Sequence, residues 1–464
     1  MGSEQSSDHR RLRLALYLTV ASALVWGIAH LWAGRTKTGV VLAALYVFVL
    51  GVVMTAITAL RPQLLSLVLQ PVWLDRITVA VVAIAALWIA VIVSSYRVTR
   101  PRGMWGARRH FASALVGLLC LVVATPMAYA ARLAHVSQDV VNTVFSASEP
   151  GSVRSDKDAW AGKPRLNILL VGADAAKNRP GARTDSMTVA SVDTHSGRTV
   201  LFSLPRNLEH VPMPPGPASL AFPYGFTGNH DATSPGLLNE VYEWGADHPD
   251  MVPGVADPRQ RGITLLKQTI GGILGIDVDY YAMVDMRGFA QIIDAIGGVT
   301  VTVREPIVFG RYREGLLPAG TRRLSGEEAL WYGRSRTDSD DYVRMGRQKC
   351  LLNAIAKQAE PVNVLRGFDR IADAAKRYVS TDVPQRLLPA LVELSDKVKA
   401  TSVKSVQFVP PLISTVYPDW ELIKHKVSDA IKADRVAAAR DEPGRPARAT
   451  PSPSDAVSLD AICD

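Results

Sequence analysis

Cysteine is scarce in this chain: Cys120, Cys350 and Cys463 are the only three among 464 residues. None of them lies in a Cys-x-x-Cys pair or beside clustered histidines, and the nine histidines are scattered. Zinc sites are built from closely spaced cysteine and histidine ligands. The sequence therefore argues against a zinc protein, and no internal repeat is visible in it either.

Charged residues are missing from four long apolar stretches, all of which lie before residue 133. Each stretch approaches the roughly 20 residues that a helix needs to cross a bilayer. The stretches run from Leu14 to Trp32, Gly39 to Ala59, Thr78 to Ser95 and Phe111 to Ala130. They predict an α-helical membrane domain over residues 1–132 with about four apolar segments.

The distribution of arginine indicates how this domain is oriented. The link Arg97–His110 carries five arginines and should be cytoplasmic, so everything after Arg132 is expected on the extracytoplasmic side of the cell membrane. Counting backwards puts the amino terminus outside if the first stretch spans, although its own arginines prefer the inside. Either the charge rule is violated or Leu14–Trp32 is re-entrant. No small-residue cleavage site follows a lone apolar run, so removal of a signal peptide is not expected.

Composition divides the rest of the chain into three parts. Residues 133–163 mix polar, glycine, proline and serine residues, which is typical of a stalk. Residues 164–433 contain the periodic segments of a globular domain, and residues 434–464 predict a polar, flexible tail. Within the globular domain, Val211–Pro235 is rich in proline and glycine and predicts a mobile flap.

Three short apolar runs open the globular domain and predict buried strands: Leu166–Val171, Met187–Val192 and Thr199–Leu204. The turn-forming set Thr194–Gly197 joins the second run to the third, so these two should form a hairpin. With the turn centred between residues 195 and 196, a residue near 185 faces one near 206. The pattern therefore predicts that Asp185 and Arg206 are neighbours at the open end of the hairpin.

Two further charged residues can reach the same edge of the sheet. Asp174 follows the first predicted strand and Arg183 precedes the second. Carboxylates prefer hard divalent cations, whereas the guanidinium fork of arginine suits phosphate oxygens. The combination suggests a site for a metal and a pyrophosphate. The alternative is a set of ordinary surface ion pairs at strand ends, which contribute little to stability.

The second half of the domain predicts an α/β fold. Asp279–Asp285 and Val299–Val303 are typical of strands, and Met286–Ile296 between them is typical of a helix. This order is a β-α-β unit, so we expect a mixed central β-sheet that is partly parallel and flanked by helices. Ser325–Glu328 matches a capping box and should begin another helix.

A dense cluster of charge follows that helix. If a helix restarts near Asp341, then Arg344, Arg347 and Gln348 share one face of it. Arginine rather than lysine suits bidentate recognition of phosphate. The alternative is a solvated charged face. The cluster consists of Arg334, Arg336, Asp338, Asp340, Asp341, Arg344, Arg347 and Gln348.

These motifs resemble those of the LytR-CpsA-Psr family of bacterial cell-wall glycopolymer transferases. The resemblance covers roughly residues 164–417 and rests on NILLVGAD, ARTDSM, SLPRN, the Asp285–Val299 segment with its Gly-Gly pair, and RLSGEEALWYGRSRTDSDDYVRMGRQ. It implies an enzyme that moves a glycopolymer from a polyprenyl-pyrophosphate carrier to a peptidoglycan hydroxyl through a phosphodiester. It also implies an apolar tunnel for the prenyl chain between the sheet and its helices.

The resemblance implies a role for each matching residue. Asp174 and Asp185 would hold Mg²⁺, with Mn²⁺ as the alternative ion. Asp341 or one of the metal-binding carboxylates would take the proton of the acceptor hydroxyl. The residues expected to bind the pyrophosphate are Arg183, Arg206, Arg334, Arg336, Arg344 and Gln348, and the catalytic set is Asp185, Arg206, Arg334, Arg336 and Asp341.

The chain departs from the family in two places. Asn207 stands where an aspartate usually follows the arginine of SLPR, which removes one negative charge. The several apolar amino-terminal segments also exceed the single anchor of many members. Two other functions stay open: hydrolysis of a polyprenyl pyrophosphate, and lipid binding by a membrane regulator or scaffold without catalysis. Nucleic acid is not an expected partner, because an exported domain does not meet the chromosome.

The two exported cysteines form an even pair in an oxidising compartment. We therefore predict a disulfide between Cys350 and Cys463 that ties the tail to the domain. The alternative is two unpaired thiols.

Overall fold

The structure is a computed structural model of the chain. It describes residues 2–58, 71–100, 107–145, 159–160, 162–174, 183–228, 235–310, 312–337, 339–358, 367–441 and 456–463. The chain forms two compact units, Met1–Val141 and Asn142–Asp464, which are taken one at a time below.

The first unit consists of helices. These are α1 (Gly2–Leu24), α2 (Ile28–Trp32), α3 (Thr36–Thr58), α5 (Pro71–Thr99) and α6 (Ala107–Val144). Among the residues that the structure describes, three segments are long and apolar enough to cross a membrane: Thr36–Thr55, Asp75–Thr99 and Arg109–Val144. The last three predicted apolar stretches lie in these helices, although 59 falls outside the described residues, as do 101–106 of the basic link.

The first predicted stretch does not form one spanning helix. Helix α1 ends at Leu24, and a turn leads into the short helix α2. Gly27 makes the turn with a φ of 93°, and a Cβ atom there would lie 2.3 Å from the carbonyl oxygen of Gly39. A side chain at this position would therefore prevent the close approach of the two helical segments. Three of the four predicted apolar stretches therefore lie in long helices, and the first is divided between α1 and α2.

The predicted stalk begins as helix. Residues 133–144 continue α6 without interruption. Residues 146–158 and 161, the middle of the predicted stalk, lie outside the described residues.

The second unit is built on a mixed sheet with the strand order β11-β10-β3-β2-β1-β4-β9. Strands β1 and β4 run parallel, as do β3 and β10, and the other neighbours are antiparallel. The strands are β1 (Arg165–Asp174), β2 (Arg183–Asp193), β3 (Thr199–Leu204), β4 (Tyr280–Asp285), β9 (Val379–Thr381), β10 (Val403–Gln407) and β11 (Val457–Ser458).

The predicted hairpin is confirmed in its register. Met187 faces Leu204 and Val192 faces Thr199, so the turn is centred between residues 195 and 196. The carboxylate of Asp193 accepts hydrogen bonds from the backbone N–H groups of His195 and Ser196 at 3.1 and 2.9 Å. These hydrogen bonds stabilise the turn locally, within four residues of the chain.

The predicted β-α-β unit is wrong in one respect. Helix α10 (Met286–Ala295) follows β4, but β5 (Val299–Val303) leaves the central sheet and pairs with β8 (Gly320–Leu324). Gly297 and Gly298 both have positive φ angles, 90° and 89°, and redirect the chain at this point. The sheet is mixed as expected, but its parallel pairs join strands that are distant in sequence. A second small sheet pairs β6 (Ile307–Phe309) with β7 (Gly315–Leu317).

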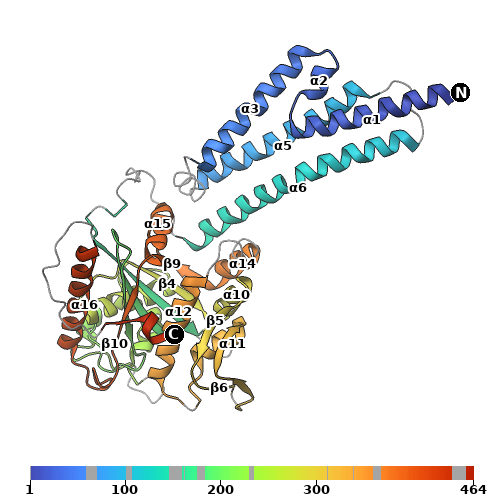
Figure 1. The fold of residues 1–464 in the computed structure, drawn as a ribbon. Helices are drawn as coiled ribbons and strands as arrows, with labels where there is room; N and C mark the ends of the chain where they lie inside the picture. The colour runs from blue at the N-terminus through green and yellow to red at the C-terminus, as the bar shows by residue number, and fades with distance from the viewer. Residues whose placement is uncertain are drawn as a thin grey trace. The chain divides into compact units, whose positions relative to one another are not determined.

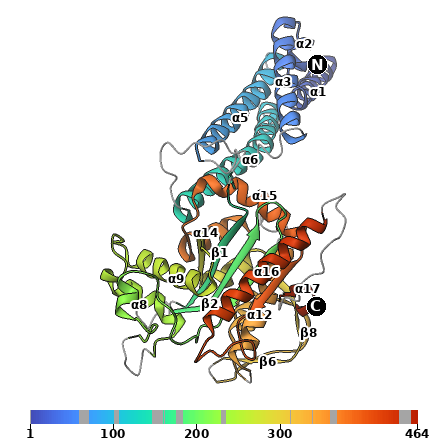
Figure 2. The ribbon, with the colours of Figure 1, turned by 90° about the vertical axis from the view of Figure 1, so that its left-hand side faces the viewer.

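Helices cover both faces of the central sheet (Figure 1). One face packs against α8 (Val241–Asp247), α9 (Pro258–Leu274) and α16 (Trp420–Asp441), and Figure 2 shows α16 lying across it. The other face carries α10, α11 (Gly326–Arg334) and α12 (Asp341–Gln358). Successive residues of β1 point to opposite faces of the sheet. Leu169 is buried in the core on the face that packs against α8, α9 and α16, and Leu170 lines a cavity on the face that carries α10, α11 and α12.

Shorter elements complete the second unit. They are α7 (Pro217–Ala221), α14 (Phe368–Tyr378), α15 (Leu388–Lys399) and α17 (Leu459–Cys463), with 3₁₀ turns at Leu238–Glu240, Pro249–Met251 and Gln385–Leu387. The capping box at the start of α11 is confirmed, because Ser325 and Glu328 exchange side-chain and backbone hydrogen bonds.

The expected flap is anchored over most of its described length. Val211 and Phe226 are buried in the main core, and Phe226 packs edge-on against Trp244 with the ring centroids 5.6 Å apart. This part of the segment, which we expected to be mobile, is therefore held by core packing. Residues 229–234 of it lie outside the described residues.

The expected flexible tail is also corrected. Helix α16 passes the predicted boundary at 433, and the buried Asp434 accepts a hydrogen bond from Arg165 at 3.1 Å. Residues 456–463 then form β11 on the sheet edge, followed by α17. Residues 442–455 lie outside the described residues.

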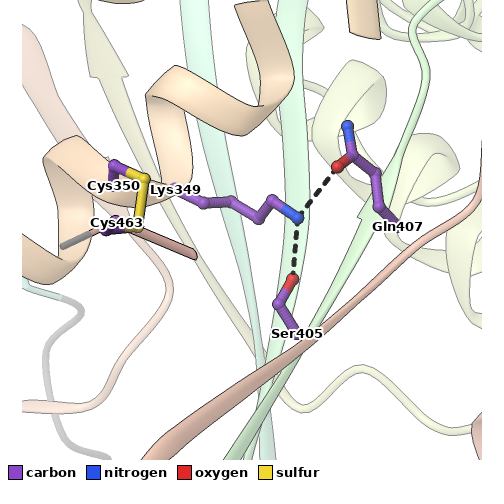
Figure 3. Close-up of a disulfide and its surroundings, with 5 residues drawn as sticks. All are labelled: Lys349, Cys350, Ser405, Gln407 and Cys463. Atoms are coloured by element: carbon purple, nitrogen blue, oxygen red, sulfur yellow. Dashed lines mark hydrogen bonds between the residues drawn. A yellow bond between two sulfur atoms is a disulfide. The ribbon is translucent and has the colours of Figure 1, made fainter. Parts of the chain in front are cut away.

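The predicted disulfide between Cys350 and Cys463 is present, with the Cα atoms 5.2 Å apart. It joins α12 to α17, beside the buried Lys349 (Figure 3). The ammonium group of Lys349 donates to Ser405 Oγ and Gln407 Oε1, each at 3.0 Å.

Candidate active site

The predicted site residues meet in one polar pocket of about 470 Å³ at the end of the sheet. Strands β1, β2 and β3 bring their ends together there, and the α11–α12 junction closes the other side. Of the predicted residues, the pocket is lined by Asp174, Arg183, Asp185, Arg206, Arg334, Arg336 and Arg344. Asp341 lies directly behind it, within 3.4 Å of Arg206.

A β-bulge positions Asp185. Strands β1 and β2 pair Gly172 with Ser186 and then Ala173 with Thr184, so Asp185 has no partner across the ladder. An extra residue of this kind bends its strand and redirects its side chain. The hairpin register alone predicts that Asp185 lies beside Arg206, whereas the bulge turns the Asp185 side chain towards the pocket.

Arg206 joins two carboxylates. Its Nη1 donates to Asp185 Oδ1 at 2.6 Å, and its Nε lies 3.4 Å from Asp341 Oδ1. Asp341 Oδ2 also accepts from Arg344 Nη2 at 3.0 Å, and Arg336 Nη1 lies 3.9 Å from Oδ1. The predicted neighbours Asp185 and Arg206 are therefore confirmed, and Asp341 links the hairpin to the first turn of α12.

The arginines differ in exposure, which separates fixed groups from accessible ones. The Arg344 side chain is 4% exposed, whereas those of Arg334 and Arg336 are 44% and 53% exposed. Burial lowers the pKa of Arg344 from its usual value, and the neighbouring Asp341 carboxylate acts in the opposite direction. Arg334 reaches Asp174 at 3.3 Å and also lies over the ring of Trp331, 5.6 Å from its centroid.

The pocket carries an excess of positive charge. Five arginines line it, together with two aspartates, and Asp341 behind it adds a third carboxylate. The Nε atoms of Arg183 and Arg344 are buried and make no hydrogen bond in the described part of the chain. Unpaired buried donors are unfavourable. Both the net charge and these donors favour an anion with several oxygens, such as a pyrophosphate.

An apolar cavity of about 220 Å³ adjoins this pocket. It lies between the sheet and helices α10, α11 and α12, and Leu170, Phe289 and Leu352 contribute to its walls. Asp185, Arg334 and Arg344 line the cavity and the polar pocket alike. A ligand with an anionic head and an apolar chain could therefore occupy both spaces.

Two of the three residues that were predicted to share one face of α12 do so. Arg344 and Gln348 both line the apolar cavity, and Gln348 Nε2 donates to the carbonyl oxygen of Gly333 at 2.9 Å. Arg347 turns away from them and donates to the carbonyl oxygen of Ser335 at 2.5 Å. It borders a different cavity.

Asp174 and Asp185 fit the needs of Mg²⁺ only in part. The structure shows no group of three or more histidine, cysteine, aspartate or glutamate residues suited to a metal within its described ranges. Magnesium is commonly bound by one or two carboxylates together with substrate phosphates and water. The two aspartates therefore suit an ion that binds with a phosphate ligand, and the same donor set would accept Mn²⁺.

Several lining residues are absent from the predicted set. Gly310, Trp331, Ser335 and Thr337 all border the polar pocket. Trp331 and Arg334 lie one helical turn apart, and from this spacing the contact between their side chains could have been predicted. Asn207, which departs from the family pattern, has a buried side-chain oxygen that accepts no hydrogen bond from the described residues.

A mixed sheet flanked by helices, with an arginine-rich pocket beside an apolar cavity, places this unit among the α/β domains. The family model LytR_cpsA_psr matches residues 133–415, and the chain belongs to this family.

Its relatives are moderately similar. Biofilm regulatory protein A of Streptococcus mutans serotype c is 26% identical over 259 residues, which cover 53% of this chain and 57% of that protein. The polyisoprenyl-teichoic acid–peptidoglycan teichoic acid transferase TagU of Oceanobacillus iheyensis is 27% identical over 259 residues, 54% of this chain and 71% of that protein. The solved structure of Bacillus subtilis TagV covers 59% of this chain and 97% of its own, with 23% identity and a TM-score of 0.41.

Proposed function

We propose that this protein transfers a glycopolymer from a polyprenyl-pyrophosphate carrier to a hydroxyl group of peptidoglycan. One observation carries the proposal: the polar pocket and the apolar cavity share Asp185, Arg334 and Arg344. The pocket then takes the pyrophosphate and the cavity takes the first part of the prenyl chain. Membership of a family with a relative named as a teichoic acid transferase supports the reaction class.

The proposed reaction balances without a covalent enzyme intermediate. The acceptor oxygen forms a bond to the phosphorus that bears the glycopolymer, and the bond from that phosphorus to the bridging oxygen breaks. Polyprenyl monophosphate leaves, and the proton of the acceptor hydroxyl passes to a carboxylate or to water. Such a reaction requires mainly positioning and stabilisation of charge on the phosphate oxygens.

The side chains divide these tasks according to their surroundings. Arg206 is held by Asp185 and Asp341, so its guanidinium is fixed before the substrate arrives. The more exposed Arg334 and Arg336 are placed to receive the phosphates as they enter. Asp341 Oδ1 lies 3.4 Å from Arg206 Nε and 3.9 Å from Arg336 Nη1, so this carboxylate stands beside the phosphate-binding arginines and is our candidate to accept the proton of the acceptor hydroxyl.

We further propose that Asp174 and Asp185 hold Mg²⁺ when the pyrophosphate is bound. The ion would neutralise phosphate charge and polarise the reacting group. The protein then acts at the cell membrane as a multi-pass protein with its second unit on the extracytoplasmic side, as the arginine-rich link Arg97–His110 suggests.

The proposal is tested with the full-length protein in nanodiscs, a synthetic polyprenyl-pyrophosphate oligosaccharide, a peptidoglycan fragment and Mg²⁺. Arg206→Ala should lower kcat about 100- to 1,000-fold, as expected when a fixed donor to the reacting phosphate is lost. Arg206→Lys keeps the charge but loses the fork, so its rate should lie between those of the wild type and Arg206→Ala. Arg259→Ala changes an exposed arginine outside the pocket and should behave as wild type.

Product analysis separates the competing functions. A phosphodiester-linked product that requires Arg206 supports transfer. Release of sugar phosphate with no coupled product would indicate a hydrolase. Tight binding of the lipid without turnover, in the presence of acceptor and Mg²⁺, would indicate a regulator or scaffold.

A further inference from the structure

In addition to the apolar cavity, a second cavity of about 350 Å³ lies next to the polar pocket. It is bordered by α12 and by the start of the β5–β6 connection, with Cys463 of the disulfide contributing to its edge. Thr337 lines this cavity and the polar pocket alike. The two spaces are therefore neighbours.

A partition formed by Ser335, Thr337 and Ser339 separates them. Arg347 fixes this partition from the far side, because its Nη2 donates to the carbonyl oxygen of Ser335 at 2.5 Å and to Ser339 Oγ at 3.0 Å. The Nε of Arg347 is buried and makes no hydrogen bond among the described residues. Arg347 also lines the second cavity, so its cationic side chain borders the space that a ligand would occupy.

The chemistry of the second cavity differs from that of the polar pocket. Arg304 and Glu305 supply charges of both signs, and Thr302 and Ser339 supply hydroxyl groups that donate and accept. Arg347 leaves a small excess of positive charge. Such a lining suits a sugar with many hydroxyl groups and a nearby carboxylate, whereas the five arginines of the polar pocket suit a pyrophosphate.

We propose that this second cavity binds the acceptor, the sugar-peptide unit of peptidoglycan. This inference rests on the proposed transfer reaction, which needs a place for a second substrate beside the donor phosphates. The acceptor hydroxyl would reach the polar pocket past Thr337, while the rest of the sugar and a carboxylate of its attached peptide contact the lining around Arg347.

Gly346 provides a direct test. It lies on α12 and lines the second cavity but neither of the donor spaces, and a Cβ atom there would meet nothing within 4 Å. Gly346→Phe should therefore fill the cavity without disturbing the helix. Gly346→Ala controls for the loss of glycine, and Gly272→Phe places the same side chain at an exposed helical glycine that is also free of contacts.

The measurement uses full-length protein in nanodiscs and a soluble disaccharide-peptide fragment of peptidoglycan. Calorimetric titration without donor gives the Kd of the fragment, and turnover with the synthetic lipid donor gives the KM of each substrate. Gly346→Phe should raise the fragment Kd and the acceptor KM roughly ten- to a hundredfold. Its donor KM should stay within about twofold of wild type, as should both KM values of the two controls.

The outcomes separate this inference from the function on which it rests. If wild type transfers the polymer but Gly346→Phe leaves the fragment Kd and the acceptor KM unchanged, the cavity is not the acceptor site although the transfer reaction stands. If Gly346 controls fragment binding but no coupled product forms, the cavity stands and the transfer reaction fails. Should Gly346→Phe fold poorly, Val343→Trp fills the same cavity from a side chain that is 50% exposed.

Discussion

Removal of the Cys350–Cys463 disulfide tests how the last described segment is held. The bridge spans a sequence separation of 113 residues, for which loop entropy in the unfolded chain predicts about 5 kcal/mol of stabilisation. If the segment is released in the folded variant, it gains conformational entropy there as well, and the net loss of stability is smaller. We therefore expect Cys350→Ala combined with Cys463→Ala to lower the free energy of unfolding by about 2–5 kcal/mol.

The contacts that the structure describes for residues 456–463 do not offset the cost of ordering this segment without the bridge. Ordering these residues opposes docking by on the order of 10 kcal/mol. The buried Leu459 returns only about 2 kcal/mol, and the hydrogen bonds of the short β10–β11 ladder add about 1 kcal/mol each. The double variant should therefore release β11 and α17, while the rest of the sheet stays folded.

Hydrogen exchange measures this release locally. Lys404 and Ser405 of β10 pair with β11 on one side and with β3 on the other, and the one of their two amides that points to β11 should exchange faster in the double variant. Cys120→Ala removes the free cysteine, which lies in the first unit, and is the matched control. Unchanged exchange in β10, together with a free energy of unfolding within about 1 kcal/mol of wild type, would refute the reasoning.

Two further predictions concern the helices beside the site. Burial lowers the pKa of Lys349 from 10.5 to about 8, so the folded protein binds fewer protons than the unfolded chain between these values. The free energy of unfolding should therefore rise by about 3 kcal/mol as the pH rises through that window. Urea unfolding of Lys349→Met should lack this pH-dependent rise. An equal pH dependence in the variant would contradict the assignment to Lys349. At the start of α11, a Cβ atom on Gly326 would lie 2.0 Å from the carbonyl oxygen of Ala290, so Gly326→Ala should displace the helix and cost about 1–3 kcal/mol, measured as a fall in Tm. Gly333→Ala on the same helix meets its nearest atom at 3.5 Å and serves as the control; equal Tm values for the two variants would show that the contact at Gly326 is relieved without displacement.

The parts of the site that depend on local sequence were predictable. The pairing of Asp185 with Arg206 follows from the turn alone, because an antiparallel register is determined by counting from the turn centre. The helix that begins at Asp341 and the capping box at Ser325 are also local features. The disulfide was predictable from the even number of cysteines after the predicted membrane domain rather than from geometry.

The parts that depend on distant contacts were not. Strand β5 follows β4 and α10 in the order of a parallel unit, yet it pairs with β8 in a separate sheet. Its alternating pattern indicates that one face of the strand is buried, but it does not specify the strand with which β5 pairs. The bulge at Asp185 likewise comes from the pairing of β1 with β2, which no single strand specifies.

The tail and the flap show a related difficulty. Polar composition predicts flexibility in residues 434–464, but a buried ion pair at Asp434 and the disulfide at Cys463 hold parts of this segment in place. Proline and glycine predict mobility between Val211 and Pro235, but Phe226 reaches the core. In each case a few anchoring residues outweigh the average composition of the segment.

The hairpin turn has a consequence for how the chain tolerates insertions and deletions. Surface loops usually accept changes in length, but a single residue added between Thr194 and Gly197 would shift every pair of β2 and β3 by one position. Gly197 has a φ of 76° and no room for a side chain, since a Cβ atom there would lie 2.4 Å from the backbone of Lys397. The turn is at the opposite end of the hairpin from Arg206, yet its length determines which carboxylate that arginine meets. Length variation among homologous chains should therefore be excluded from this turn even though it touches no substrate.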